Sequence, residues 1–196
     1  VRSRNKVGVL DPGHGGSDPG AVYGNRREKD DTLALAYDIG NALEQRGIRV
    51  EYTRIGDIYN SPYEKAEIGN RSAADLFLSI HRNAMPVPGT GSGTMSLIFG
   101  RGGDAETFAR NINKELAKTG WKDLGISERP NLVVLRDTAL PAVLVEVGFI
   151  DNENDNDFFD ANMSHNDLLD LTLNHLKHAC QTPEFFIEVA NLTPAI

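Results

Sequence analysis

Short apolar runs alternate with amphipathic segments along this chain of 196 residues, and this alternation is what most constrains its fold. Most of the apolar runs are nearly continuous, which is typical of strands buried on both faces of a sheet. The predicted strands cover residues 7–10, 48–53, 75–81, 93–100, 131–135 and 142–150. Helical spacing of apolar residues predicts helices over residues 29–46, 63–74, 104–118 and 165–179. The pattern predicts a three-layer α/β fold, with a mostly parallel or mixed central sheet of about six strands flanked by helices.

Length and composition narrow the class of protein further. The length suits one domain, which we place at residues 1–181, with residues 182–196 as a C-terminal tail or linker stub. A net charge of −8 argues against nucleic acid as a partner. The single cysteine, Cys180, excludes an internal disulfide framework and a Cys-rich zinc site. No apolar run approaches the roughly 20 residues that a membrane span needs, and the first residues lack the apolar core of a signal peptide.

Polar residues stand at or near the ends of three predicted strands. In VLDPGHGGSDPG, residues 9–20, prolines and glycines end the first strand and place His14 in a loop that a ligand can approach closely. His81 ends the third strand, and Glu146 interrupts the apolar run of the last one. Ligands of parallel sheets gather beyond the carboxyl ends of the strands. Taken alone, however, a histidine at such a position is more often an ordinary loop residue than a ligand.

Two glutamates have competing interpretations. Glu28 stands where the first helix is expected to begin, so it is either a helix-capping charge or a third ligand beside the two histidines. Glu146 occupies a central strand, where a carboxylate needs a cationic partner, a metal or a catalytic role. A desolvated carboxylate has the raised pKa that a general base requires.

Other candidate sites are weaker. His175 and His178 lie on a Leu-rich predicted helix whose surface they would occupy, and His165 flanks the start of that helix. The glycine-rich loop has neither phosphate-binding pattern, since it lacks both GxxxxGK[ST] and GxGxxG spacing. The acidic run at 151–157 lacks the glycine and glutamate of a calcium loop, and we interpret it as solvated helix capping.

Four segments together resemble the catalytic domain of zinc-dependent N-acetylmuramoyl-L-alanine amidases, the type 3 amidases of bacterial and phage cell-wall lysis. They are LDPGHGGSDPGA, GNRREKDDTL, ADLFLSIHRNA and PAVLVEVGFIDN, and they stand in the family's order. The resemblance implies one Zn²⁺ per chain held by His14, Glu28 and His81, with Glu146 as the catalytic glutamate. It also implies hydrolysis of the amide between N-acetylmuramic acid and the L-alanine of the stem peptide in peptidoglycan. We expect a monomer that acts at the cell wall, outside the cell. The alternative origin is a phage-encoded enzyme that reaches the same wall. A wall-binding module can be joined outside this sequence.

The chain departs from the family's usual pattern beside the second histidine. Arg82 stands where relatives often have alanine, Met95 and Ser96 lie in a strand that is often more aromatic or acidic, and Lys65 replaces a frequent arginine. We expect Arg82, Asn83 and the following loop to line a shallow substrate groove.

Some relatives carry a long inhibitory helix after the second histidine. Here the segment before Thr94 contains two prolines and three glycines, which predicts a loop and an open site. Two rivals remain: a wall-binding module that has lost catalysis, and a carboxypeptidase-like zinc hydrolase. The first would have lost a ligand or the base, and all four positions are present. The second needs an arginine for the substrate's terminal carboxylate, and no such arginine can be placed.

Overall fold

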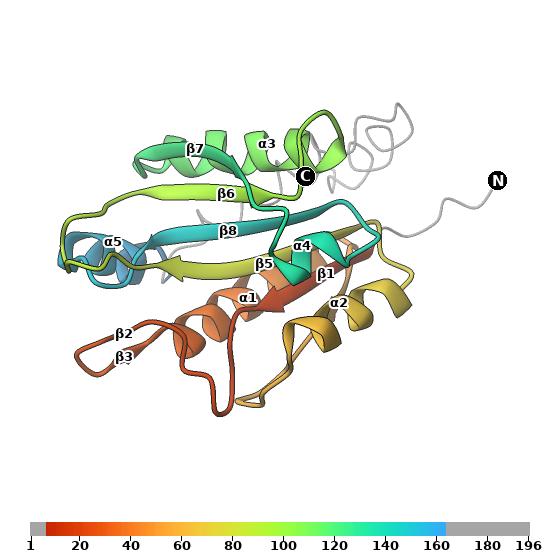
Figure 1. Cartoon of the computed structure of the whole chain (residues 1–196), viewed down its shortest axis with the longest axis horizontal. Coiled ribbons are helices and arrows are strands. Elements are labelled where there is room, and N and C mark those ends of the chain that lie inside the picture. Colours follow the sequence, from red (N-terminus) through yellow and green to blue (C-terminus); the bar gives the residue numbers. More distant parts are fainter. Residues whose placement is uncertain (1–6, 164–196) are drawn as a thin grey trace, which may run out of the picture.

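A six-stranded mixed sheet forms the centre of the computed structural model, which describes residues 7–163 (Figure 1). Its strand order is β4-β1-β5-β8-β6-β7. Four of the five strand pairs in this sheet are parallel: β4–β1, β1–β5, β5–β8 and β6–β7. The fifth pair, β6–β8, is antiparallel. The strands are β1 (Val7–Pro12), β4 (Arg49–Tyr52), β5 (Leu76–Asn83), β6 (Thr94–Ile98), β7 (Asp123–Glu128) and β8 (Ala142–Phe149). A separate two-stranded hairpin joins β2 (Val22–Tyr23) to β3 (Arg26–Arg27).

Helices cover both faces of this sheet, so the predicted three-layer architecture is confirmed. Helices α1, α3 and α5 contribute to one apolar cluster, and α2 and α4 pack on the opposite face. The helices are α1 (Glu28–Gln45), α2 (Pro62–Arg71), α3 (Asp104–Lys118), α4 (Val133–Arg136) and α5 (Glu153–Met163).

Alternation along the central strands assigns side chains to the two faces. In β8, Val143, Val145 and Val147 belong to the cluster under α1 and α3, whereas Leu144 belongs to the cluster on the other face. In β5, Phe77 belongs to that second cluster as well. Because successive side chains of a strand point to opposite faces, Ser79, His81 and Glu146 follow Phe77 and Leu144 onto the face that carries α2.

One predicted strand is wrong, and one strand of the sheet was not predicted. The apolar run at 131–135 is not a strand: it forms the short helix α4, whose Val134 and Leu135 bury their side chains against the sheet. A short apolar run fits a buried helical turn as well as a strand, and the position at the sheet edge is taken by β7. The strand β7 was missed because its residues are mostly polar and half-exposed, as in many edge strands.

The acidic run at 151–157 begins the helix α5, and Asn152 accepts from the Asp155 N–H at its start, so the helix-capping part of the prediction is confirmed. The run is not solvated as expected, because Asp151, Asn152 and Asp155 are buried, and Asp151 and Asp155 accept backbone N–H groups of Met85 and Phe149. The predicted helix at 165–179 and the predicted tail at 182–196 lie outside the described residues. Among the described residues, no helix combines the length and the apolar character needed to cross a membrane.

Candidate metal centre

The loop after β1 places His14 beside the start of α1 and the end of β5. His14 has a φ of 61°, in the left-handed region that non-glycine residues rarely adopt. Two of the surrounding glycines are required by close approach. A side chain at Gly13 would overlap the His81 ring, since its Cβ would lie 2.5 Å from a ring carbon. A Cβ at Gly20 would lie 2.5 Å from the His14 ring and 2.6 Å from a carboxylate oxygen of Glu28.

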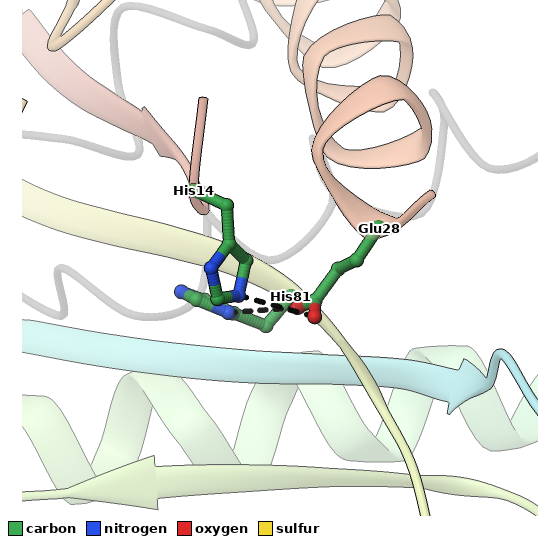
Figure 2. Close-up of side chains that lie close together, drawn as sticks. All are labelled: His14, Glu28 and His81. Atoms are coloured by element: carbon green, nitrogen blue, oxygen red, sulfur yellow. Dashed lines mark hydrogen bonds and ion pairs between the residues drawn. The ribbon is translucent and has the colours of Figure 1, made fainter. Parts of the chain in front are cut away.

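Three side chains from three elements meet at this point. Nε2 of His14 lies 3.1 Å from Oε2 of Glu28, and Nδ1 of His81 lies 2.9 Å from Oε1 of the same carboxylate. Figure 2 shows the two rings converging on Glu28. One potential ligand atom from each residue lies within 4.8 Å of the others, and this is the group among the described residues that could hold a metal ion. Two imidazole nitrogens and one carboxylate oxygen form a donor set that zinc commonly takes in catalytic sites.

Hydrogen bonds from outside this group fix the orientation of its members. Nδ1 of His14 lies 2.8 Å from Oδ2 of Asp18, which leaves Nε2 directed at Glu28. Both oxygens of Glu28 accept backbone N–H groups, from Ala21 at 2.8 Å and from Arg82 at 3.0 Å. Carboxylate partners of this kind commonly set the tautomer and the ring orientation of a metal-binding histidine.

Glu28 and His14 each shift the pKa of the other towards its charged form. Burial opposes ionisation of Glu28, but hydrogen bonds from His14 and His81 outweigh it and lower the pKa of Glu28 well below its usual range. Burial likewise opposes the charged form of His14, while Glu28 and Asp18 together raise the pKa of that ring. Glu28 is therefore a carboxylate at neutral pH, as a metal ligand must be.

Glu146 lies directly beside this group in the sheet. In the parallel pairing of β5 with β8, its Cα is the partner of His81. Its Oε2 atom is buried and has no hydrogen-bond partner. Burial raises the pKa of Glu146 to about 6, although the nearby histidines act in the opposite direction. A buried carboxylate oxygen without a partner is costly, so this one needs a ligand or a reaction to account for it.

The position of Arg82 corrects the expectation that it lines the groove. Arg82 follows His81 in β5, so its side chain points to the opposite face of the sheet, under α1 and α5. There its guanidinium donates to Asp31 and Asn156, both at 2.7 Å, and lies 4.0 Å from the centre of the Phe159 ring. Only 2% of Arg82 is exposed. Asn83, by contrast, is half-buried at the end of β5, on the same face as His81.

Sequence reasoning missed Asp18, although its position four residues after His14 in the same loop is visible in the sequence. It also missed the buried cation Arg54 behind the loop, and it singled out Lys65 as a departure from the family without assigning it a structural role. The segment between His81 and Thr94 contains no helix, as its prolines and glycines predict.

A His–Glu–His group beside a buried carboxylate is typical of metal-dependent hydrolases. The sequence profile of the N-acetylmuramoyl-L-alanine amidase family matches residues 9–177. The chain belongs to this family.

Known relatives and solved structures agree with this assignment. The chain is 39% identical to the N-acetylmuramoyl-L-alanine amidase CwlM of Bacillus licheniformis over 150 residues, which are 74% of this chain and 57% of that protein. It is 36% identical to an endolysin of Bacillus phage SPP1 over 157 residues, 77% of this chain and 57% of the endolysin. A crystal structure of an N-acetylmuramoyl-L-alanine amidase from Clostridium difficile 630 superposes with a TM-score of 0.79 at 30% identity, covering 89% of this chain and 98% of that one. The chain thus spans little more than half the length of the two curated relatives.

Proposed function

We propose that this chain is a zinc-dependent peptidoglycan amidase that cleaves the bond between N-acetylmuramic acid and the L-alanine of the stem peptide. The observation that carries the proposal is the His14–Glu28–His81 group, with the unpartnered Oε2 atom of Glu146 on the neighbouring strand. The donor set fits Zn²⁺, and the residues present therefore satisfy what the family's chemistry needs.

The residues of this chain divide the work between binding and proton transfer. His14, Glu28 and His81 would hold one zinc ion, with Asp18 fixing the ring of His14. When bound, zinc supplies Lewis-acid chemistry that polarises a carbonyl and lowers the pKa of water. Glu146 would take a proton from the attacking water and return it to the alanine nitrogen as the amide breaks. Burial suits this carboxyl to both steps, because it raises the pKa towards neutral pH, where the group can gain and lose a proton.

The substrate side of the site follows from its position on the sheet. Glycan strands and stem peptides are extended, and we infer that they lie across the carboxyl ends of β1, β5 and β8. Asn83 and the loop at 85–93 would form one wall of this groove. The relatives' names, an amidase and a phage endolysin, support action on the bacterial cell wall, outside the cytoplasm. We expect the chain to act as a monomer.

The test is digestion of purified peptidoglycan by the zinc-loaded chain, followed by mass analysis of the products. The proposal predicts free stem peptides with L-alanine amino termini and intact glycan strands. A wall-binding module would adsorb to the wall and release nothing. A carboxypeptidase-like enzyme would shorten the stem peptides from the carboxyl end and leave them attached to the glycan.

A further inference from the structure

The backbone around His14 is held in a conformation that it would not adopt unaided. Among residues 7–163, His14 is the only non-glycine residue with a positive φ. A left-handed conformation is unfavourable for a non-glycine residue, because its Cβ comes too close to a backbone carbonyl oxygen. Such strain persists where the surrounding structure over-determines it, so the contacts of this loop are where its cause lies.

Two buried cations bind the carbonyl groups of the loop. Nζ of Lys65 donates to the Pro12 carbonyl at 2.8 Å and to the His14 carbonyl at 3.5 Å. Arg54 donates to the Pro12 carbonyl at 3.1 Å and to the Gly13 carbonyl at 2.9 Å. Three consecutive carbonyl groups therefore face a buried positive charge, and Arg54 and Lys65 are 2% and 4% exposed.

Arg54 also connects the loop to the segment that carries Glu28. Its Nη2 atom donates to the Gly13 carbonyl and, at 2.8 Å, to the Lys29 carbonyl. Gly13 directly precedes His14, and Lys29 directly follows Glu28. The hydroxyl of Thr32 in α1 donates to the same Gly13 carbonyl at 2.8 Å.

The same glycine is fixed to the third ligand-bearing segment. The N–H of Gly13 donates to the carbonyl of Ile80 at 2.9 Å, and Ile80 directly precedes His81. Arg54 thus binds both peptide units of Gly13, which precedes His14, and it contacts Lys29 beside Glu28 directly and Ile80 beside His81 through the Gly13 N–H. Its planar fork of N–H groups suits this geometry, because it can donate in several fixed directions at once.

Lys65 has a carboxylate partner that balances its charge. Its Nζ lies 3.0 Å from Oδ1 of Asp11, which is 1% exposed. The other oxygen of Asp11 accepts from Ser79 at 2.6 Å. Lys65 is therefore an anchored neighbour of the loop, and Arg54 is the residue that spans the separate segments.

We propose that Arg54 is a positioning residue for the metal centre, which sets the spacing between His14 and Glu28 through the backbone carbonyls beside them and thereby sets zinc affinity. This proposal rests on the zinc site of the proposed function. It predicts that the ligands are held in place before the metal binds. Loss of the Arg54 guanidinium should therefore weaken zinc binding without unfolding the chain.

The experiment compares zinc affinity in Arg54→Lys with affinity in the wild type. The variant keeps the charge, but a single ammonium group cannot reproduce the fork. Zinc affinity is measured by competition with a chromophoric chelator, at a temperature where circular dichroism shows the zinc-free variant to be folded. Loss of an outer partner of a metal site costs about 10- to 100-fold in affinity, and we expect a loss in this range.

Asn113→Ala is the matched control for a purely structural effect. Asn113 is equally buried and bridges Ser96, Asp123 and Gly125 beneath α3, away from the metal centre. This control should lower the unfolding temperature and leave zinc affinity unchanged.

Thr32→Val is a second, milder variant for the case that Arg54→Lys does not fold. It removes the hydroxyl that donates to the Gly13 carbonyl and accepts from Nη2 of Arg54 at 3.2 Å, and we expect a several-fold loss of zinc affinity. Wild-type affinity in whichever of these two variants folds would overturn the positioning role. A wild-type chain that fails to bind zinc would contradict the metal centre itself, and the positioning role with it.

Discussion

Glu146 of β8 lies beside His81 of β5 in the parallel register of the central sheet, with both side chains on the face that carries α2. This pairing brings the two residues together although 64 residues separate them, as their numbers show. The neighbouring strand β1 ends just before His14, which completes the arrangement from the other side. Three adjacent parallel strands thus deliver two histidines and one carboxylate to one edge of the sheet, as expected for open α/β sheets.

The first prediction concerns the metal itself. His14→Ala should abolish stoichiometric zinc binding, because it removes one of three ligands and leaves Glu28 with one histidine partner. Metal content after dialysis against zinc, measured by plasma emission spectrometry, checks this. A variant that retained one zinc ion per chain and full activity would remove His14 from the site.

A second prediction concerns Asp18. Asp18→Asn keeps all three ligands but weakens the hydrogen bond that orients the His14 ring, so zinc affinity should fall by about 10- to 100-fold. Asp30→Asn is the matched control, since Asp30 is a half-exposed carboxylate paired with Arg27 on the surface of α1. Equal zinc affinity in the two variants would show that Asp18 has no orienting role.

A third prediction follows from the raised pKa of Glu146. In the zinc-free protein this carboxyl holds its proton more tightly when folded than when unfolded, because burial raises its pKa from 4.5 to about 6. The ionised Glu146 carboxylate therefore lowers the free energy of unfolding. This penalty is fully present above about pH 6 and disappears as the pH falls below 4.5. Glu146→Gln should avoid this cost, on the order of 1–2 kcal/mol.

Urea unfolding of the zinc-free wild type and of Glu146→Gln at pH 4 and pH 7 checks this prediction. The variant should gain stability relative to the wild type between the lower and the higher pH. Titrating groups far from Glu146 are common to both proteins and cancel in the difference, whereas His14, Glu28 and His81 interact with Glu146 and are part of the effect measured. A stability difference that is the same at both values would mean that Glu146 titrates normally.

A fourth prediction concerns access to the site. The segment between β5 and β6 contains no helix, and its irregular backbone is fixed on α5. Asp155 accepts from Ser92 at 2.7 Å and from the Gly93 N–H at 3.0 Å, while Asn152 donates to the Gly91 carbonyl at 2.7 Å. We expect this loop to leave the site open, so the zinc-loaded chain should hydrolyse wall fragments without an activator protein. Activity that begins only when a separate activator is added would point to another blocking segment.

Most of the sheet could be predicted because its strands are continuous apolar runs with clear boundaries. The four candidate residues at strand ends and at the helix start could be identified for the same reason, and the resemblance assigned their roles. Residues 131–135 could not be assigned correctly, because the choice between a strand and a helical turn depends on which sheet edge is free. The side of the sheet on which Arg82 lies was predictable from alternation with His81, but its partners on α1 and α5 come from distant parts of the chain. The role of Arg54 could not be predicted from the sequence, because Arg54 binds backbone carbonyl groups, which every residue has.

The most direct test of the account is the turnover of Glu146→Gln with its zinc in place. Glutamine keeps the size of the side chain but cannot accept the proton from the attacking water. The variant should fold, carry one zinc ion per chain and cleave the amide about 10²- to 10⁴-fold more slowly than the wild type. Turnover close to that of the wild type, with the metal bound, would contradict the account and leave Glu146 as a buried structural carboxylate.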